Sequence, residues 1–369
     1  MRSMNKFILM GSAFLLAAGA TNANASCDSV LSSYSWLITE PGMELEAAEL
    51  VSTNPECFGG SATTSQTQIS STSVQQAIAI STALAARTLG ASPMDQQTAG
   101  RETKSMAGGG KSAFNTWISG SINSTDQNYT AANTFNTKNE TDIRTGIFGA
   151  DYALSPTMAA GLSVALDDGD GLGINAAAGS TPNIFTSNGY LIAPYFGIQI
   201  TNELAADVSA GLGKGEMDIS GNVSTDSDRL FAAANLSYSK WLGNAQLTGK
   251  LGYIHAEEKY DNMEVLGVEQ LGTNAKNKLD QLRGGVQAGY WMDGVMPYAG
   301  LSYSEDVNRS TTLAAAPEDP IGEEAFQWTL GVNFISPTIG LSAGFAYSQE
   351  AGRSNQDNDV IMANLNYRF

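Results

Sequence analysis

The chain has 369 residues, and its 37 acidic against 19 basic side chains give a formal net charge of −18 at neutral pH. This acidic balance argues against nucleic acid as a partner and against docking on anionic lipid headgroups through a basic patch. Beyond residue 25 there is no stretch of about 18 apolar residues, and the mean hydropathy of the chain is slightly negative. An integral membrane protein with that profile must be a closed barrel, in which alternate residues face water.

Residues 1–25 are typical of an export signal. Two basic residues precede an apolar run of 14 residues, Phe7–Ala20, and the small-residue pattern Ala23-Asn24-Ala25 follows it. The run is too short to span a bilayer, and the small residues suit a cleavage site. We therefore expect the mature chain to begin at Ser26. A lipoprotein acylated at Cys27 is disfavoured, because asparagine stands where such signals require a leucine-like residue.

Residues 26–72 form a short N-terminal segment that ends in a Ser/Thr/Gln-rich tract. The segment contains both cysteines of the chain, Cys27 and Cys57. In an oxidising periplasm the default is one disulfide between them. Closing a loop of about 30 residues would stabilise a small unit by roughly 3–4 kcal/mol in the chain-entropy model.

Residues 73–90 contain the clearest helical pattern, from Ser73 to Leu89. Ser73 and Gln76 are spaced as a capping box, and Gly90 provides a C-terminal stop. At about 1.5 Å per residue the helix spans roughly 25 Å, comparable to the apolar band of a membrane barrel. This slim, Ala-rich helix would fit as a plug in the lumen of a twelve-stranded barrel. The alternative is an ordinary amphipathic helix in the periplasm, since residues 91–112 form a long linker.

Residues 113–369 divide into segments in which apolar and polar residues alternate with period two, which is typical of strands with one apolar and one polar face. Phe326, Leu330 and Phe334, for example, share one face of their segment. The sequence therefore predicts an all-β fold, a 12-stranded antiparallel transmembrane β-barrel. The predicted strands are Phe114–Ser124, Thr141–Leu154, Thr157–Leu166, Phe185–Ile200, Glu203–Lys214, Asp228–Leu242, Ala245–Glu257, Lys278–Met292, Met296–Ser304, Ala325–Ile335, Ile339–Ser348 and Asp359–Phe369.

The connections between these strands alternate between tight turns and long polar loops. The expected turns are Ser155-Pro156, Thr201-Asn202, Gly243-Asn244, Asp293-Gly294 and Ser336-Pro337. The expected loops are Thr125–Glu140, Asp167–Ile184, Gly215–Ser227, Glu258–Asn277, Glu305–Glu324 and Gln349–Asn358. Short periplasmic turns and long outer loops are the usual asymmetry of membrane barrels, and an even strand number places both barrel termini in the periplasm. A soluble propeller or sandwich would not need this rhythm.

The last ten residues form an amphipathic strand that ends on an aromatic residue. Its apolar positions are Ile361, Ala363, Leu365, Tyr367 and Phe369. About ten residues is the length that a tilted strand needs to cross a bilayer. The pattern resembles the C-terminal signal that the outer-membrane barrel assembly machinery recognises; the alternative is an edge strand of a soluble sheet.

Together these motifs resemble the β-domain of the autotransporter family (type V secretion) over about Ala113–Phe369. The resemblance is carried by the twelve strands, the upstream helix and short motifs in a fixed order: Asn115–Gly120, Gly146–Leu154, Met296-Pro297-Tyr298 and Asn366–Phe369. It implies a monomeric barrel in the outer membrane of a Gram-negative bacterium, which translocates or displays an N-terminal segment. The implied partners are outer-membrane lipid, lipopolysaccharide, periplasmic chaperones and the assembly machinery.

Two features depart from the family pattern. Residues 26–72 are short for a passenger and show no β-helix repeat. Some family members cut the chain at an asparagine in the lumen helix, but Val74–Leu89 contains none, so self-cleavage is not expected. The alternative function is a stand-alone outer-membrane pore or adhesin-like barrel whose N-terminal segment stays periplasmic.

No catalytic, cofactor or metal site is expected. His255, the only histidine, lies beside Glu257 and Glu258, and we interpret it as a structural residue of the barrel rim rather than half of a Ser–His dyad in a barrel hydrolase. The stretch 167–171 (Asp-Asp-Gly-Asp-Gly) offers oxygen ligands for calcium, but the remaining spacing of an EF-hand loop is absent. A solvated loop is the better interpretation.

Four charged residues fall on the polar phase of their strands and are expected to face the lumen: Arg144, Asp207, Lys250 and Arg283. They would either set ion selectivity or brace the helix. The acidic residues of the outer loops would bind lipopolysaccharide through divalent cations, bind a basic partner, or keep the loops soluble.

Overall fold

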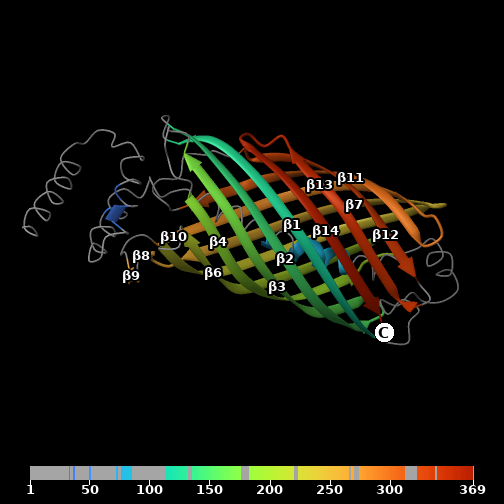
Figure 1. The fold of residues 1–369 in the computed structure, drawn as a ribbon. Helices are drawn as coiled ribbons and strands as arrows, with labels where there is room; N and C mark the ends of the chain where they lie inside the picture. The colour runs from blue at the N-terminus through green and yellow to red at the C-terminus, as the bar shows by residue number, and fades with distance from the viewer. Residues whose placement is uncertain are drawn as a thin grey trace, which may run out of the picture.

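Twelve long antiparallel strands close into one barrel, seen from the side in Figure 1. The computed structural model describes residues 33, 36–37, 50, 72–73, 76–84, 113–131, 135–175, 183–219, 223–265, 267–269, 274–311, 322–336 and 339–368. The barrel strands are β1 (Phe114–Ala131), β2 (Phe135–Ser155), β3 (Met158–Asn175), β4 (Asn183–Gln199), β5 (Leu204–Ile219), β6 (Val223–Leu242), β7 (Ala245–Tyr260), β10 (Ala275–Tyr290), β11 (Val295–Thr311), β12 (Glu324–Ser336), β13 (Leu341–Ala351) and β14 (Gln356–Arg368). A small hairpin, β8 (Glu264–Val265) and β9 (Val268–Glu269), pairs with the outer end of β6.

The ring closes because the first and last strands pair with each other. Ile118 of β1 lies opposite Phe148 of β2 on one side and opposite Leu365 of β14 on the other. With the additional pairing of β5 and β6, every barrel strand has two neighbours and no edge is left open. All twelve predicted strands and the closed all-β architecture are confirmed.

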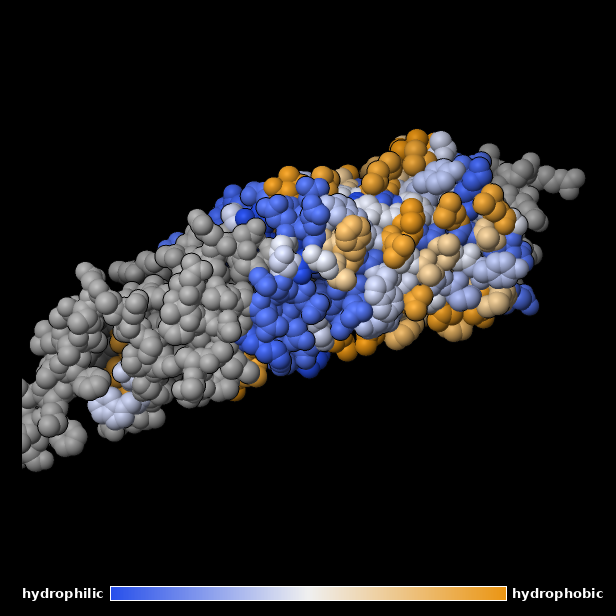
Figure 2. Space-filling model, turned by 90° about the horizontal axis from the view of Figure 1, so that it is seen from above, coloured by the Kyte–Doolittle hydropathy of each residue, from blue (hydrophilic) through white to orange (hydrophobic). Residues whose placement is uncertain are grey.

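Alternate residues of each strand point outward and form an apolar belt. Leu212, Val286 and Leu330 are more than half exposed on this outer face, which in a bilayer meets lipid. Figure 2 shows apolar side chains concentrated on the right-hand part of the wall, while the part to their left is largely hydrophilic. The apolar part of the wall suits contact with the hydrocarbon of a bilayer, and the hydrophilic part suits contact with water.

The outward apolar residues of the last strand lie on the belt, as their alternation predicts. They are Ile361, Ala363, Leu365 and Tyr367. Phe369 lies outside the described residues, as do Cys27 and Cys57. The assembly signal and the disulfide therefore stay predictions.

The outer ends of the strands are longer than predicted. Thr125–Glu140 was expected to be a loop, yet β1 continues to Ala131 and β2 begins at Phe135. Pairs such as Asp126 with Glu140 continue the hydrogen-bonded ladder. Outside the bilayer both faces of a strand can be polar, so the alternation that identified the strands disappears although the ladder persists. We call these parts of the strands beyond the belt the polar extension.

The short turns are stabilised by local hydrogen bonds and by left-handed residues. Thr201 Oγ1 accepts hydrogen bonds from the backbone N–H groups of Glu203 (3.2 Å) and Leu204 (3.0 Å). Gly243 (φ 63°) and the pair Asp293 (φ 49°) and Gly294 (φ 94°) adopt the left-handed region where the predicted turns lie. Such turn chemistry explains why the sequence located these connections correctly.

One helix, residues 76–84, lies inside the barrel, where Figure 1 shows it between the strands. Residues 72–73 are also helical, and the predicted continuation from residue 85 lies outside the described residues. Within the described part of the chain, no helix has both the length and the hydropathy that crossing a membrane as a helix would require.

The position of the apolar belt predicts how the stability cost of an introduced arginine varies along the barrel axis. Val286 lies between Leu282 and Tyr290 on the outer face of β10, near the middle of the belt, whereas Asn188 of β4 lies on the outer face above it. Val286→Arg should lower the free energy of unfolding in lipid vesicles by about 2–4 kcal/mol, and Asn188→Arg by no more than about 1 kcal/mol. Urea titration measures both, and equal losses would contradict the assignment of the belt.

Candidate functional site

The helix packs against one side of the lumen wall through small and aliphatic residues. Ile80 and Leu84 are buried in a cluster with inward residues of several strands: Trp117, Ile147, Leu191, Tyr195, Phe231 and Ile254. At Gly197 a Cβ atom would lie 3.0 Å from the Leu84 side chain, so a larger residue in the wall would push the helix away. Ala77 and Ala83 are also buried in this contact. Small residues therefore let helix and wall approach closely.

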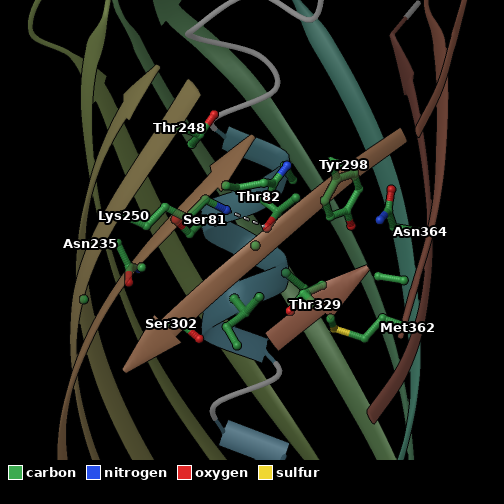
Figure 3. Close-up of a pocket in the computed structure, with 18 of the residues that line it drawn as sticks. Ser81, Thr82, Asn235, Thr248, Lys250, Tyr298, Ser302, Thr329, Met362 and Asn364 are labelled. Carbon is green, nitrogen blue, oxygen red and sulfur yellow. Dashed lines mark hydrogen bonds between the residues drawn. The ribbon is translucent and has the colours of Figure 1, made fainter. Parts of the chain in front are cut away.

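Polar contacts tie both ends of the helix to the wall. Gln76 Nε2 donates to Ser163 Oγ of β3 (3.1 Å), and Lys250 Nζ of β7 donates to Thr82 Oγ1 (3.4 Å). Figure 3 shows Lys250 reaching to the helix beside Ser81 and Thr82. Gln76 Oε1 accepts no hydrogen bond. The reciprocal bond of the predicted capping box is therefore not formed; the Gln76 amide donates to the adjacent wall instead.

The direction of the helix follows from its contacts on two neighbouring strands. Gln76 contacts Ser163, which pairs with Ala193 of β4, whereas Leu84 lies against Gly197. Gly197 is four residues nearer the turn end of β4, or about 13 Å, and eight residues of helix rise about 12 Å. The helix thus runs nearly parallel to β4. Its C-terminal end faces the end with the short turns, where β1 begins and β14 ends, and its N-terminal end faces the polar extension.

The other side of the lumen is a cavity of about 370 Å³ between the helix and the wall that runs from β6 and β7 through β10–β14 to β1. It extends from the turn ends of the strands, at Gln246 and Ser342, to mid-barrel residues such as Arg283. Hydroxyl and amide side chains line it together with apolar ones, and Figure 3 shows Tyr298, Ser302 and Asn364 around it. The helix therefore leaves part of the lumen unfilled.

Three of the four charged residues predicted for the lumen face it: Asp207 is buried, and Lys250 and Arg283 line the cavity. The prediction for Arg144 is wrong. Its side chain is 55% exposed on the outer face, where it pairs with Asp168 (3.4 Å) and Asp170. At this level β2 has left the apolar belt, so a charged side chain can point outward into water at little cost.

A buried ion-pair cluster joins three strands in the lumen above the helix. Arg229 of β6 is 2% exposed and donates to both carboxylate oxygens of Asp167 (2.7 and 2.9 Å) and to Glu258 Oε1 (2.8 Å). At Gly189 a Cβ atom would lie 2.1 Å from Arg229 Nη1, so this glycine makes room for the guanidinium. Arg229 was missed in the sequence, although its position two residues before the inward Phe231 is the signal that could have identified it.

This cluster corrects two sequence interpretations. Glu258 was assigned to an acidic outer loop, but it is a fully buried residue of β7 that also accepts a hydrogen bond from Ser227 Oγ (2.6 Å). Asp167 was read as part of a solvated loop, but β3 continues through it. Because neighbouring strand residues point to opposite faces, Asp167 faces the lumen while Asp168 and Asp170 face outward. These carboxylates therefore do not converge on one cation, and no group of metal-ligating side chains occurs in the described residues.

A second cluster lies on the opposite side of the ring. Arg353 Nη1 and Nη2 donate to the two carboxylate oxygens of Asp306 (2.7 and 3.2 Å), and its Nε donates to Glu350 (2.7 Å). Gln281 Nε2 also donates to Asp306 (2.7 Å). The cluster connects β10, β11 and β13. Bidentate contacts of this kind are among the stronger polar interactions in proteins, so both clusters hold the polar extension together.

His255 lies in the polar extension, bound to a carboxylate. Its Nδ1 lies 2.6 Å from Asp280 Oδ1, to which Tyr253 also donates (2.7 Å), and Asn308 donates to Asp280 Oδ2 (3.0 Å). Burial opposes ionisation of Asp280, but these hydrogen bonds outweigh it and lower the pKa of the carboxyl. Among the described contacts of His255 none joins it to a serine hydroxyl. This arrangement is that of a structural histidine.

The buried cluster and the exposed pair make a matched comparison. Arg229→Met leaves two carboxylates buried without their cation, and should lower the free energy of unfolding by about 3–5 kcal/mol. Arg144→Met removes an exposed cation paired with two exposed carboxylates and should cost no more than about 1 kcal/mol. Urea titration in lipid vesicles measures both values. If the two variants lost the same stability, the Arg229 cluster would not be holding the ring.

The helix should limit conduction through the lumen. Deleting residues 73–90 should raise the single-channel conductance in planar bilayers, because the strands keep their own hydrogen bonds. Ala83→Trp should act like the deletion, since Ala83, although it also borders the cavity, is buried in the contact between helix and wall. Ile78 borders the cavity and is only partly buried, so Ile78→Trp should leave the helix in place. Equal conductance for the full-length and deleted proteins would show that the helix does not obstruct the pore.

The barrel sequence matches a known family. Residues 116–352 match the family model described as Autotransporter beta-domain. Among curated protein sequences, none matches the chain.

Three solved translocator structures share the fold. The translocator domain of the autotransporter NalP from Neisseria meningitidis superposes with a TM-score of 0.54 at 11% identity, covering 70% of this chain and 89% of that one. The transport unit of AIDA-I from Escherichia coli gives 0.53 at 14%, with 71% and 91% covered. The β-domain of the Bordetella autotransporter Brka gives 0.51 at 13%, with 70% and 100% covered. At these identities the likeness is one of fold.

Proposed function

The chain belongs to the autotransporter β-domain family, and we propose from this that its barrel moves residues 26–72 across the outer membrane of a Gram-negative bacterium and displays them at the surface. The segment remains attached to the barrel, because Val74–Leu89 contains no asparagine at which a family-type self-cleavage would cut. The function proposed is therefore display of a short tethered segment.

The observation that carries this proposal is the direction of the lumen helix. Residue 84 lies toward the end of the barrel with the short turns, and residue 76 lies toward the polar extension. The chain before the helix is thus directed away from the end at which β1 begins. In Figure 1 the blue residues of this part, 36–37 among them, lie beyond the end of the barrel that carries β8 and β9.

We extend the proposal to the partners. The belt would contact outer-membrane lipid, and the charged outer face above it, with Arg144 and Asp168, would meet lipopolysaccharide. Periplasmic chaperones would deliver the exported chain as a monomer, and the assembly machinery would read its last strand up to Phe369. A disulfide between Cys27 and Cys57 would compact the displayed segment.

A stand-alone pore is the second candidate, and the cavity beside the helix favours it. In that case residues 26–72 would stay in the periplasm and the lumen would serve a solute.

A tag inserted after Ser26 separates the two candidates. Display predicts that antibody and added protease reach this tag in intact cells. A matched tag in the turn Gly243-Asn244, at the opposite end of the barrel, should react only after the outer membrane is permeabilised. Protection of both tags until permeabilisation would contradict display and leave the pore.

A further inference from the structure

We propose that the lumen contains a binding site for an oxyanion, a phosphate or a carboxylate, formed by Lys250 of β7 and Arg283 of β10. Both side chains line the cavity beside the helix, and no aspartate or glutamate is among the described residues that line it. This is unexpected in a chain with 37 acidic and 19 basic residues. The proposal does not depend on translocation, because it concerns the barrel at rest.

The strand register places the two cations side by side. Lys250 lies opposite Gly285, and Arg283 lies opposite Gly252. Lys250 and Arg283 are therefore diagonal neighbours on the same face, a spacing of about 7–8 Å that long side chains can bridge. Their charges repel each other at this distance. A bound anion would relieve that repulsion.

Neither cation forms an ion pair with a carboxylate of the residues that the structure describes. No carboxylate in the described residues lies within 4.0 Å of Lys250 Nζ or the Arg283 guanidinium, whose hydrogen bonds go to Thr82 and to Gln327 Oε1 (3.1 Å). Asp207, a carboxylate that attracts Lys250 from farther away, accepts a hydrogen bond from Asn235 Nδ2 (2.8 Å). Glu350 and Asp306 attract Arg283 from farther away, and both accept hydrogen bonds from Arg353. Lys250 and Arg283 are partly buried, and cations withdrawn from water in proteins are normally paired, as Arg229 is. The two lumen cations thus lack the partner that an anion would supply.

The surroundings offer neutral donors for the remaining oxygens of such an anion. Thr82 of the helix and Tyr298 and Ser302 of β11 line the same cavity, and Figure 3 shows Lys250 and these three around one space. Two cations with hydroxyl donors suit an oxyanion, since charge-assisted hydrogen bonds to oxyanions are the strong ones.

Two sources could supply this chemistry. One is a free anion that enters the cavity from the turn end of the barrel. The other is the N-terminal segment itself in transit, because residues 26–72 contain six carboxylates and no lysine, arginine or histidine: Asp28, Glu40, Glu44, Glu46, Glu49 and Glu56. This second source rests on the translocation proposed above.

The first experiment tests the free anion on the purified full chain in micelles. Phosphate at about ten times its dissociation constant should raise the midpoint of thermal unfolding, followed by heat-modifiable gel mobility, by about 2–4 °C relative to chloride at equal ionic strength. The rise should disappear in K250Q/R283Q. It should persist in K250R/R283K, which keeps both charges, and in R144Q, which removes a cation from the outer face.

The second experiment tests the carboxylates by the rate at which a tag after Ser26 becomes surface-exposed. The effect of K250Q/R283Q on this rate is compared between the native segment and a segment whose six acids are changed to amides. The variant should slow exposure of the native segment by a factor at least about twofold larger than the factor for the amide segment. Either positive result supports the site and identifies its source. The proposal is overturned if phosphate shifts the unfolding midpoint equally in wild type and K250Q/R283Q and if K250Q/R283Q slows exposure of the native and amide segments equally. If no tag reaches the surface in any variant, translocation fails while the phosphate result still decides the site.

Discussion

The structure depends on one constraint: no backbone hydrogen-bonding group may be left unpaired in hydrocarbon. The pairing of β1 with β14, from Asn115 opposite Arg368 to Gln127 opposite Gln356, meets this constraint because it removes both open edges of the sheet. Once the ring has closed at twelve strands, the width of the lumen is set. The small residues of the helix, the polar lining and the inward ion pairs all follow from that enclosed space.

Inside the lumen, the polarity of the side chains differs between the level of the belt and the level above it, and between the two sides of the barrel. At the level of the belt, the helix and the strands around Trp117 and Phe231 form an apolar contact, while the facing wall stays polar and partly empty. Above the belt, Arg229 binds carboxylates of β3 and β7, and Arg353 binds carboxylates of β11 and β13. These clusters stabilise the polar extension, whose outer face lies beyond the apolar belt.

The sequence predicted the parts of this structure that local patterns encode. Lipid contact forces every second residue to be apolar, so β12 could be read from Phe326, Leu330 and Phe334 alone. The polar extension carries no such pattern, and β1 and β2 were therefore cut short. The phase of Arg144 was misread for the same reason. The partners of Arg229 come from β3 and β7, and the neighbourhood of Lys250 and Arg283 depends on a register across a long connection. Contacts of this kind exist only after the ring has closed.

The position of the helix also has a topological consequence. Residues 76–84 lie inside a ring made from later residues of the same chain, whose seam is formed by β1 and β14. The chain thus passes through the ring that its own later residues form, and the N-terminal segment is covalently joined to that ring. A force applied to the chain before the helix, at the end of the barrel with the polar extension, acts along the barrel axis on the contacts of Ile80 and Leu84. A barrel of this topology is its own mechanical anchor, and it releases the segment only when the backbone is cut.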